Sequence, residues 1–261
     1  MKKWRPSHKA LYVIPEIHGN AETLEVILNK ILPLRFFKNQ EDMLVCLGDY
    51  IDKEENGHLV LDILINIKNE YKDRVILLKG NHEEMMLRAL YGSDNDFNYW
   101  IDNNGLSTVS GYLKRNGMNT NAYSITKGRF QDLVPKTHIE LLKSLSAYAI
   151  IDDYCFFHGG FNIEKSIVEN NISNFMFDNT SNKYVKDCIR NKIEPLFKDD
   201  YIFVGAHNYM GKEPFIHRRY FALGGNASPR KLYVFDLNSM AAGYVNRGKG
   251  SIINYRFKTY E

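Results

Sequence analysis

The chain has 261 residues, with 34 basic and 31 acidic side chains and a formal net charge of +3. Apolar residues make up 44% of the sequence and aromatic residues 13%, which excludes a chain kept disordered by low hydrophobicity and high charge. The apolar runs are far shorter than the roughly 20 residues of a membrane span, and the first residues do not resemble a signal peptide. We therefore expect a cytoplasmic protein with no membrane partner and a single domain over residues 1–261.

The first half of the chain alternates apolar runs with helical patterns. Strands are predicted at 11–14, 43–47 and 75–78. Helices are predicted after Asn20 as a capping residue, over the apolar stripe at 60–67, and from Glu83 to Leu90. Strands that alternate with helices indicate β-α-β units and a largely parallel sheet.

The pattern changes in the second half. Residues 91–136 are polar, aromatic and weakly periodic, which favours a helical or loop-rich cap. Strands are predicted at 148–151, 154–157, 201–204, 232–235 and 252–257, with a partly helical polar insertion at about 174–198. We expect this half to form a second, more antiparallel sheet, so that two sheets are flanked by helices.

Three cysteines, Cys46, Cys155 and Cys188, are an odd number without a close pairing pattern. Buried, reduced thiols are the expected state for them. The small positive charge suits an anionic substrate and gives no specific signal for nucleic acid.

Polar residues gather where five of the predicted strands end. The five segments read PEIHGN, GDYIDK, GNHE, HGG and GAHN. Ligands of open α/β sheets bind at the carboxyl ends of strands, so these segments are expected to meet at one rim. Their donors are imidazoles, carboxylates and an amide, which suit manganese, iron or zinc. Two such cations side by side can bind a phosphate and activate water.

The five segments, in this order, resemble the phosphoprotein phosphatase branch of the calcineurin-like metallophosphoesterases. The resemblance covers about residues 11–237 and implies a four-layer αββα sandwich with two mixed sheets. It implies two divalent cations, with manganese expected and iron or zinc as alternatives. The metal ligands that it implies are Glu16, His18, Asp49, Asn81, His158 and His207. One ion would be held by His18 and Asp49, with Glu16 at the aspartate position of the same motif. Asp49 would bridge to the other ion, whose further ligands would be Asn81, His158 and His207.

The resemblance also implies the catalytic roles. His82 matches the general acid that protonates the leaving oxygen, and Asp52 matches the carboxylate that orients this histidine. A neighbouring carboxylate raises the pKa of an imidazole and fixes its tautomer, which suits that role. The implied reaction is direct attack of activated hydroxide on phosphorus.

This chain departs from the family pattern at three places. Glu16, after Pro15, stands where the family has aspartate, and it is one methylene longer. Lys53 replaces an arginine, which keeps the charge but loses the bidentate fork for phosphate. Asn179 stands where a second phosphate-binding arginine is common, and Arg190 is the expected substitute, with Arg218, Arg219 and Arg230 as further candidates.

Three functions remain open from the sequence. The first is a metal-dependent phosphomonoesterase, specifically a serine/threonine protein phosphatase that acts on phosphorylated proteins. The second is a hydrolase of dinucleoside polyphosphates such as diadenosine tetraphosphate. The third, motivated by Glu16, Lys53 and Asn179, is a phosphatase-like binding protein with reduced activity.

Overall fold

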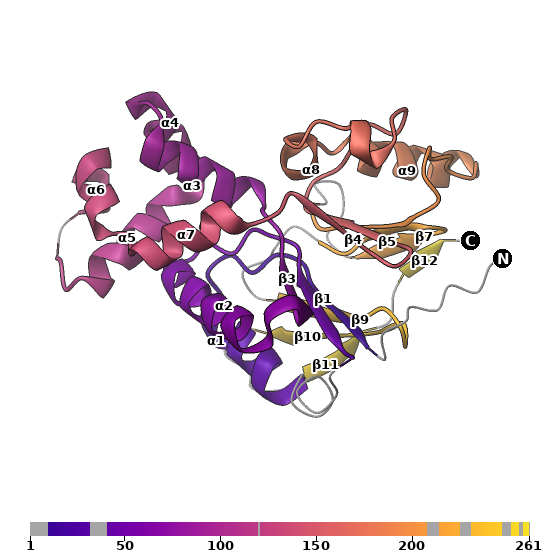
Figure 1. The fold of residues 1–261 in the computed structure, drawn as a ribbon, viewed down its shortest axis with the longest axis horizontal. Coiled ribbons are helices and arrows are strands. Elements are labelled where there is room, and N and C mark those ends of the chain that lie inside the picture. The colour runs from indigo at the N-terminus through magenta and orange to yellow at the C-terminus, as the bar shows by residue number, and fades with distance from the viewer. Residues whose placement is uncertain are drawn as a thin grey trace.

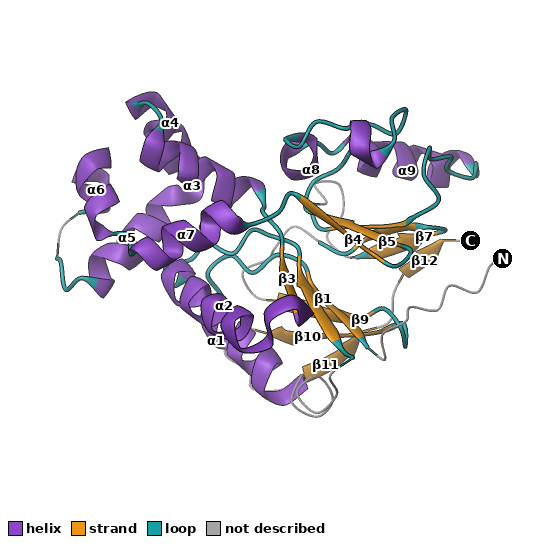
Figure 2. Ribbon diagram, viewed as in Figure 1, coloured by secondary structure: helices purple, strands orange, loops and turns teal. Residues whose placement is uncertain are grey.

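A computed structural model describes residues 10–31, 41–119, 121–207, 214–224, 231–246, 252–255 and 258–260. Within these residues the chain forms two sheets of six strands each, and helices cover their outer faces (Figure 1). Figure 2 shows the two groups of strands between the helices of the first half of the chain and those near residues 174–191.

The first sheet has the strand order β11-β10-β9-β1-β2-β3. Strands β1 to β3 pair in parallel, and the others pair antiparallel. Their bounds are β1 Leu11–Ile14, β2 Met43–Cys46, β3 Val75–Leu77, β9 Lys231–Asp236, β10 Ala241–Asn246 and β11 Ile252–Tyr255.

The second sheet has the order β12-β7-β8-β6-β5-β4. It is mixed, since β5 pairs with β6 in parallel and with β4 antiparallel. The strands are β4 Tyr148–Ile151, β5 Tyr154–Phe157, β6 Ile202–Gly205, β7 Phe215–His217, β8 Tyr220–Ala222 and β12 Lys258–Tyr260.

Helices from the first half pack on the first sheet, and α8 and α9 pack on the second. The helices are α1 Ala21–Val26, α2 Gly57–Tyr71, α3 Asn81–Tyr91, α4 Asp94–Trp100, α5 Leu106–Arg115, α6 Lys127–Leu133, α7 Lys136–Ser144, α8 Asn174–Phe177 and α9 Thr180–Asn191. None of the described helices is both long and apolar enough to cross a bilayer.

The four layers follow from the alternation of side chains along the strands. Leu11 and Val13 point between the sheets, where they pack with Phe156. Tyr12 and Ile14 point to the other face, into the core that the helices of the first half cover. Because successive side chains of a strand face opposite ways, a fully apolar strand must be covered on both faces. This confirms the expected four-layer sandwich.

The segment at 91–136 is helical and packs against α2 and α3. Its aromatic side chains Phe97 and Trp100 are buried, whereas Tyr91 and Tyr99 are exposed. The insertion at 174–198 contains α8 and α9. That the first segment acts as a cap stays a prediction.

Two expectations need correction. Strands β9 and β11 join the first sheet and not a second sheet made from the second half, because β9 pairs antiparallel with β1. Asn20 is at the N-cap position of α1, but its side chain donates to the carbonyl of Ile17 (2.9 Å) instead of capping the helix. Residues 256 and 257 of the last predicted strand lie outside the described residues.

All three cysteines are free and buried, as expected. Burial raises the pKa of the Cys46 thiol to about 12. The thiol therefore stays protonated near neutral pH, and it has the character of a core residue.

Replacing Phe156 with alanine should lower the free energy of unfolding by about 3–5 kcal/mol, because the ring is fully buried between the sheets. Ile150→Ala is the control on the neighbouring strand, where the side chain is 40% exposed, and it should cost less than about 1 kcal/mol. Urea unfolding measures both. Equal losses would show that the space between the sheets is not the main core.

Candidate active site

The residues that the sequence singled out lie just beyond the strands. Glu16 and His18 follow β1, Asp49 and Asp52 follow β2, and Asn81 and His82 begin α3 after β3. His158 and His207 follow β5 and β6 of the other sheet. Their donor atoms meet in two groups that share Asp49.

The first group is formed by Glu16, Asp49, His158 and His207, with one donor atom from each within 4.8 Å of the others. The Nε2 atom of His158 lies 3.3 Å from Oδ2 of Asp49 and 3.2 Å from Nδ1 of His207. Asn81 adds its Oδ1 atom 3.1 Å from the same nitrogen. Donors from both sheets therefore converge on one point.

The second group is formed by His18, Asp49 and His82. The Nε2 atom of His18 is 3.4 Å from Oδ2 of Asp49 and 3.5 Å from Oε2 of Glu16. The Nε2 atom of His82 is 3.8 Å from the same Asp49 oxygen. Asp49 is thus placed to serve both groups. Glu16, which was expected beside His18, belongs to the first group, although its carboxylate stays near His18.

Backbone carbonyls orient two of the imidazoles. The Nδ1 atom of His158 lies 3.0 Å from the carbonyl of Leu47, and that of His18 lies 3.0 Å from the carbonyl of Ile51. A carbonyl oxygen can only accept, so each Nδ1 donates and each Nε2 faces the centre. This is the usual orientation of a histidine that ligates a metal.

The donor set fits divalent cations. Around Nε2 of His158 lie a carboxylate oxygen, an amide oxygen and a second imidazole nitrogen, all of them lone-pair donors. Such atoms repel one another in a buried site unless a positive charge lies among them. In the metal-free protein a proton on His158 can supply that charge, and a cation with nitrogen and oxygen ligands would supply it more fully.

Charge interactions within the cluster shift the pKa values of its groups. Burial alone would raise the pKa of the Asp49 carboxyl, but His158, His82 and His18 hold it well below its usual range. Burial and the neighbouring His158 lower the pKa of His207 to about 4. Asp49 is therefore ionised and His207 neutral near pH 7, which are the forms that bind metal.

His82 and Asp52 form a buried pair beside the second group. The Nδ1 atom of His82 lies 2.7 Å from Oδ2 of Asp52, and that oxygen also accepts from the indole nitrogen of Trp100 at 2.8 Å. Thr108 donates to the other oxygen of Asp52 at 2.6 Å. The carboxylate is therefore fixed by three donors, and it fixes the ring of His82 in turn.

Glu83 anchors the turns that carry these residues. Its fully buried carboxylate accepts the backbone N–H groups of Asp49 (2.8 Å), Tyr50 (2.7 Å) and Gly80 (2.9 Å). The turn after β2 is thereby joined to the turn after β3. The sequence analysis gave Glu83, Trp100 and Thr108 no role in the site, although Glu83 is the last residue of the GNHE segment.

The backbone of the site is strained. His18, Asp49, Asp52 and Lys53 all have left-handed φ angles, between 46° and 67°. Such conformations cost about 1–3 kcal/mol each in ordinary residues and persist where other contacts hold them. At Gly48 (φ 103°) a Cβ atom would lie 2.4 Å from the backbone nitrogen of Gly80, so the two turns touch directly.

Of the residues predicted to bind phosphate, one lies at the donor groups, and Arg190 and Arg219 make ion pairs elsewhere. Lys53 reaches the centre, with Nζ 2.8 Å from Nε2 of His18. Arg190 donates to Asp187 on the same helix and its side chain is 71% exposed. Arg219 donates to Asp200 and to neighbouring carbonyls. Binding of phosphate by Arg190 stays a prediction, and Arg230 lies outside the described residues.

Glu83→Gln should lower the free energy of unfolding by about 1–3 kcal/mol for each backbone N–H left without an acceptor. An amide has a single acceptor oxygen where the carboxylate has two. The control is Glu84→Gln, the next residue, whose side chain is 21% exposed, and it should cost less than about 1 kcal/mol. Equal urea midpoints for both variants would contradict the anchoring role.

His82 should titrate at an unusually high pH in the metal-free protein. Burial lowers its pKa, but the carboxylates of Asp49 and Asp52 raise it to about 9. A folded pKa above the unfolded value of about 6.5 means that this stabilisation is complete below pH 6.5 and is lost as pH rises through 9. NMR titration of the ring measures this, and Asp52→Asn should lower the pKa. A value near 6.5 in the unmutated protein would contradict the pairing.

Comparisons with known proteins identify the family of the chain. The family model for calcineurin-like phosphoesterases matches residues 10–238. The serine/threonine-protein phosphatase rdgC of Drosophila melanogaster is 25% identical over 139 residues, which are 51% of this chain and 20% of rdgC. A candidate serine/threonine-protein phosphatase of Caenorhabditis elegans, C06A1.3, is 35% identical over 80 residues, 31% of this chain and 21% of that protein. The matches thus span about a fifth of the length of these curated relatives.

Solved structures show the same fold. A candidate diadenosine tetraphosphatase aligns over 93% of this chain and 96% of its own, with a TM-score of 0.59 and 14% identity. A cold-active protein-tyrosine phosphatase from a psychrophilic Shewanella aligns over 97% of this chain and 82% of its own, with a TM-score of 0.54 and 16% identity. With the family match across nearly the whole chain, the protein belongs to the calcineurin-like phosphoesterase family.

Proposed function

We propose that the protein hydrolyses phosphate monoesters with two divalent cations, and that its substrates are proteins phosphorylated on serine or threonine. The observation that carries this proposal is the position of Asp49, which belongs to both donor groups and lies beside the His82–Asp52 pair. A carboxylate shared by two cation sites, next to a proton donor, suits phosphate hydrolysis at two cations. The partial matches to serine/threonine phosphatases support the substrate class.

The residues of the two groups would hold the cations. Glu16, Asp49, Asn81, His158 and His207 would bind one, and His18 with Asp49 would bind the other. Bound there, divalent cations would neutralise charge on the phosphate and lower the pKa of water. The mixed nitrogen and oxygen donors suit manganese, iron or zinc, and manganese is the ion that we expect from the family resemblance.

His82 would hold the proton that the leaving oxygen needs. Its Nδ1 atom is paired with Asp52, so its Nε2 atom is the one that faces Asp49 and the centre. The hydrogen bonds from Trp100 and Thr108 keep the Asp52 carboxylate in one orientation. Asp52 therefore positions the imidazole and favours its charged form. Lys53 would bind phosphate oxygens. Arg190, which lies between Gly160 and Val204 in the sequence, would substitute for the arginine that is missing at Asn179.

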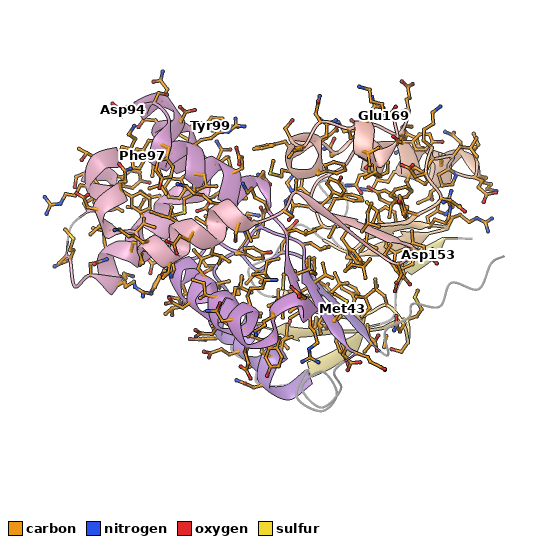
Figure 3. All side chains as sticks on the ribbon, in the orientation of Figure 1. Met43, Asp94, Phe97, Tyr99, Asp153 and Glu169 are labelled. Atoms are coloured by element: carbon orange, nitrogen blue, oxygen red, sulfur yellow. The ribbon has the colours of Figure 1, made fainter. Side chains whose placement is uncertain are left out.

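A second candidate substrate is a dinucleoside polyphosphate. A cavity of about 590 Å³, within the usual range for small-molecule sites, lies between α3, α4 and the segment around α8. Its lining residues are Met85, Arg88, Asp96, Tyr99, Ser173, Asn174, Phe177 and Asp178. Figure 3 shows Tyr99 on α4, on the side toward α8.

The cavity is next to the proposed reaction site. Met85 lies one helical turn after His82, and a Cβ atom on Gly159, which follows His158, would lie 2.8 Å from the carbonyl of Asp178. The guanidinium of Arg88 lies 5.7 Å from the centre of the Phe177 ring. Tyr99 and Phe177 are 59% and 39% exposed, so two aromatic surfaces are available for a base to stack on.

Asp49→Asn should lower kcat/KM for a phosphoserine peptide by about a thousandfold or more. It removes the ligand shared by the two proposed cations, which would stabilise the transition state by several kcal/mol. The assay uses manganese and compares the peptide with diadenosine tetraphosphate. Faster turnover of the peptide supports the phosphatase, and faster turnover of the dinucleotide supports the second candidate. Equal inertness of the unmutated protein and the variant on both substrates would contradict catalysis of this kind and favour the third candidate, a phosphatase-like binding protein.

Tyr99→Ala should raise KM for diadenosine tetraphosphate about tenfold at unchanged kcat, if a base stacks in the cavity. The matched control is Tyr123→Ala in the same helical region, where the side chain is 77% exposed and is not part of the cavity lining. Turnover of a simple aryl phosphate should not change in either variant. An unchanged KM for the dinucleotide in Tyr99→Ala would contradict a base-binding cavity.

A further inference from the structure

We propose that the ammonium group of Lys53 occupies the cation position at His18, so that the centre binds its two metal ions in a fixed order. The ion on the His158 side binds first. The ion on the His18 side binds only when Lys53 withdraws. The inference rests on the proposed function in one respect, namely that the centre binds divalent cations.

The contacts of His18 leave a single lone pair for a cation. Its Nδ1 atom lies 3.0 Å from the carbonyl of Ile51 and must donate to it. Its Nε2 atom must then accept, and it lies 2.8 Å from Nζ of Lys53, which is a donor only. A metal ion held by His18 would need the same lone pair of this nitrogen. The ammonium and the ion therefore exclude each other.

The His158 side is arranged differently. Nε2 of His158 lies 3.1 to 3.3 Å from Oδ1 of Asn81, Nδ1 of His207 and Oδ2 of Asp49. A cation could bind to all of these atoms at once. Glu16, Asp49, His158 and His207 present one donor each within 4.8 Å. This side gathers more metal ligands than the His18 side, so it should hold its ion more tightly.

Lys53 can withdraw at little cost. The residue as a whole is exposed, although its ammonium reaches the buried ring of His18. Rotation of the flexible stem into solvent therefore leaves the core unchanged. The left-handed backbone at Asp52 and Lys53 (φ 67° and 62°) turns the chain so that the first side chain meets His82 and the second meets His18.

Two of the departures from the family sequence, Glu16 and Lys53, thus both lie beside His18. Glu16, longer than aspartate, joins the group on the His158 side while staying 3.5 Å from Nε2 of His18. Lys53 has a compact ammonium group where the family has the planar guanidinium of an arginine, and the ammonium can donate to the single lone pair of His18. At low metal concentration the centre would hold one ion and one ammonium. At high concentration it would hold two ions, with Lys53 released toward the substrate side.

Calorimetric titration of metal-free protein with Mn²⁺, together with metal analysis after dialysis, tests this order without any substrate. The unmutated protein should bind one ion tightly and a second at least tenfold more weakly. Lys53→Met should tighten the second step about tenfold and leave the first within twofold. His18→Asn should abolish the weak step alone, which assigns it.

Lys79→Met is the matched control, because Lys79 directly precedes Gly80 and pairs with Glu84 (3.3 Å) outside the donor groups. It should bind both ions as the unmutated protein does. Circular dichroism melts verify that each variant is folded. Two equally tight ions in the unmutated protein, no bound ion at all, or an unchanged second step in Lys53→Met would overturn the inference. A protein that shows the predicted order yet hydrolyses no phosphate ester would refute the proposed function alone.

Discussion

The site depends above all on the buried carboxylate of Glu83. A charged group with no exposed surface is unfavourable unless it is fully hydrogen-bonded, and this one accepts backbone N–H groups from Asp49, Tyr50 and Gly80. Burial and the nearby charge of Asp49 raise its pKa, and the backbone donors oppose that shift. The hydrogen bonds offset the cost of the buried charge. They also hold the strained backbone at Asp49, whose side chain belongs to both donor groups.

The second constraint is the packing of one sheet on the other. Apolar side chains of β1, β2, β5 and β6 form a shared core, and this core brings the carboxyl ends of strands from both sheets together. His158 ties the two sheets at that edge, since its ring donates to the carbonyl of Leu47 after β2. The N–H groups of Ala206 and His207 donate to the carbonyl of His158, at 2.9 and 2.7 Å. Donor side chains separated by more than a hundred residues are thus brought close together.

The sequence allowed much of this arrangement to be predicted, and its limits have physical causes. Buried parallel strands such as β1 and β2 are continuous apolar runs, and polar residues directly after them identify the rim of the sheet. Strands β7 and β8, of three residues each, and β10, with its mixed burial, have no comparable local pattern. That β9 pairs with β1 depends on contacts between distant parts of the chain. Trp100 and Thr108 act on Asp52 from 48 and 56 residues away, so local spacing could not identify them.

The central claim is that Asp49 joins two groups of donors that hold divalent cations. Crystals of the protein grown with Mn²⁺, measured at the manganese absorption edge, test it most directly. We predict an anomalous difference peak among Asp49, Asn81, His158 and His207, and at higher Mn²⁺ a second peak between Asp49 and His18. A fully folded protein whose map has no anomalous peak within ligand distance of Asp49 would contradict the account.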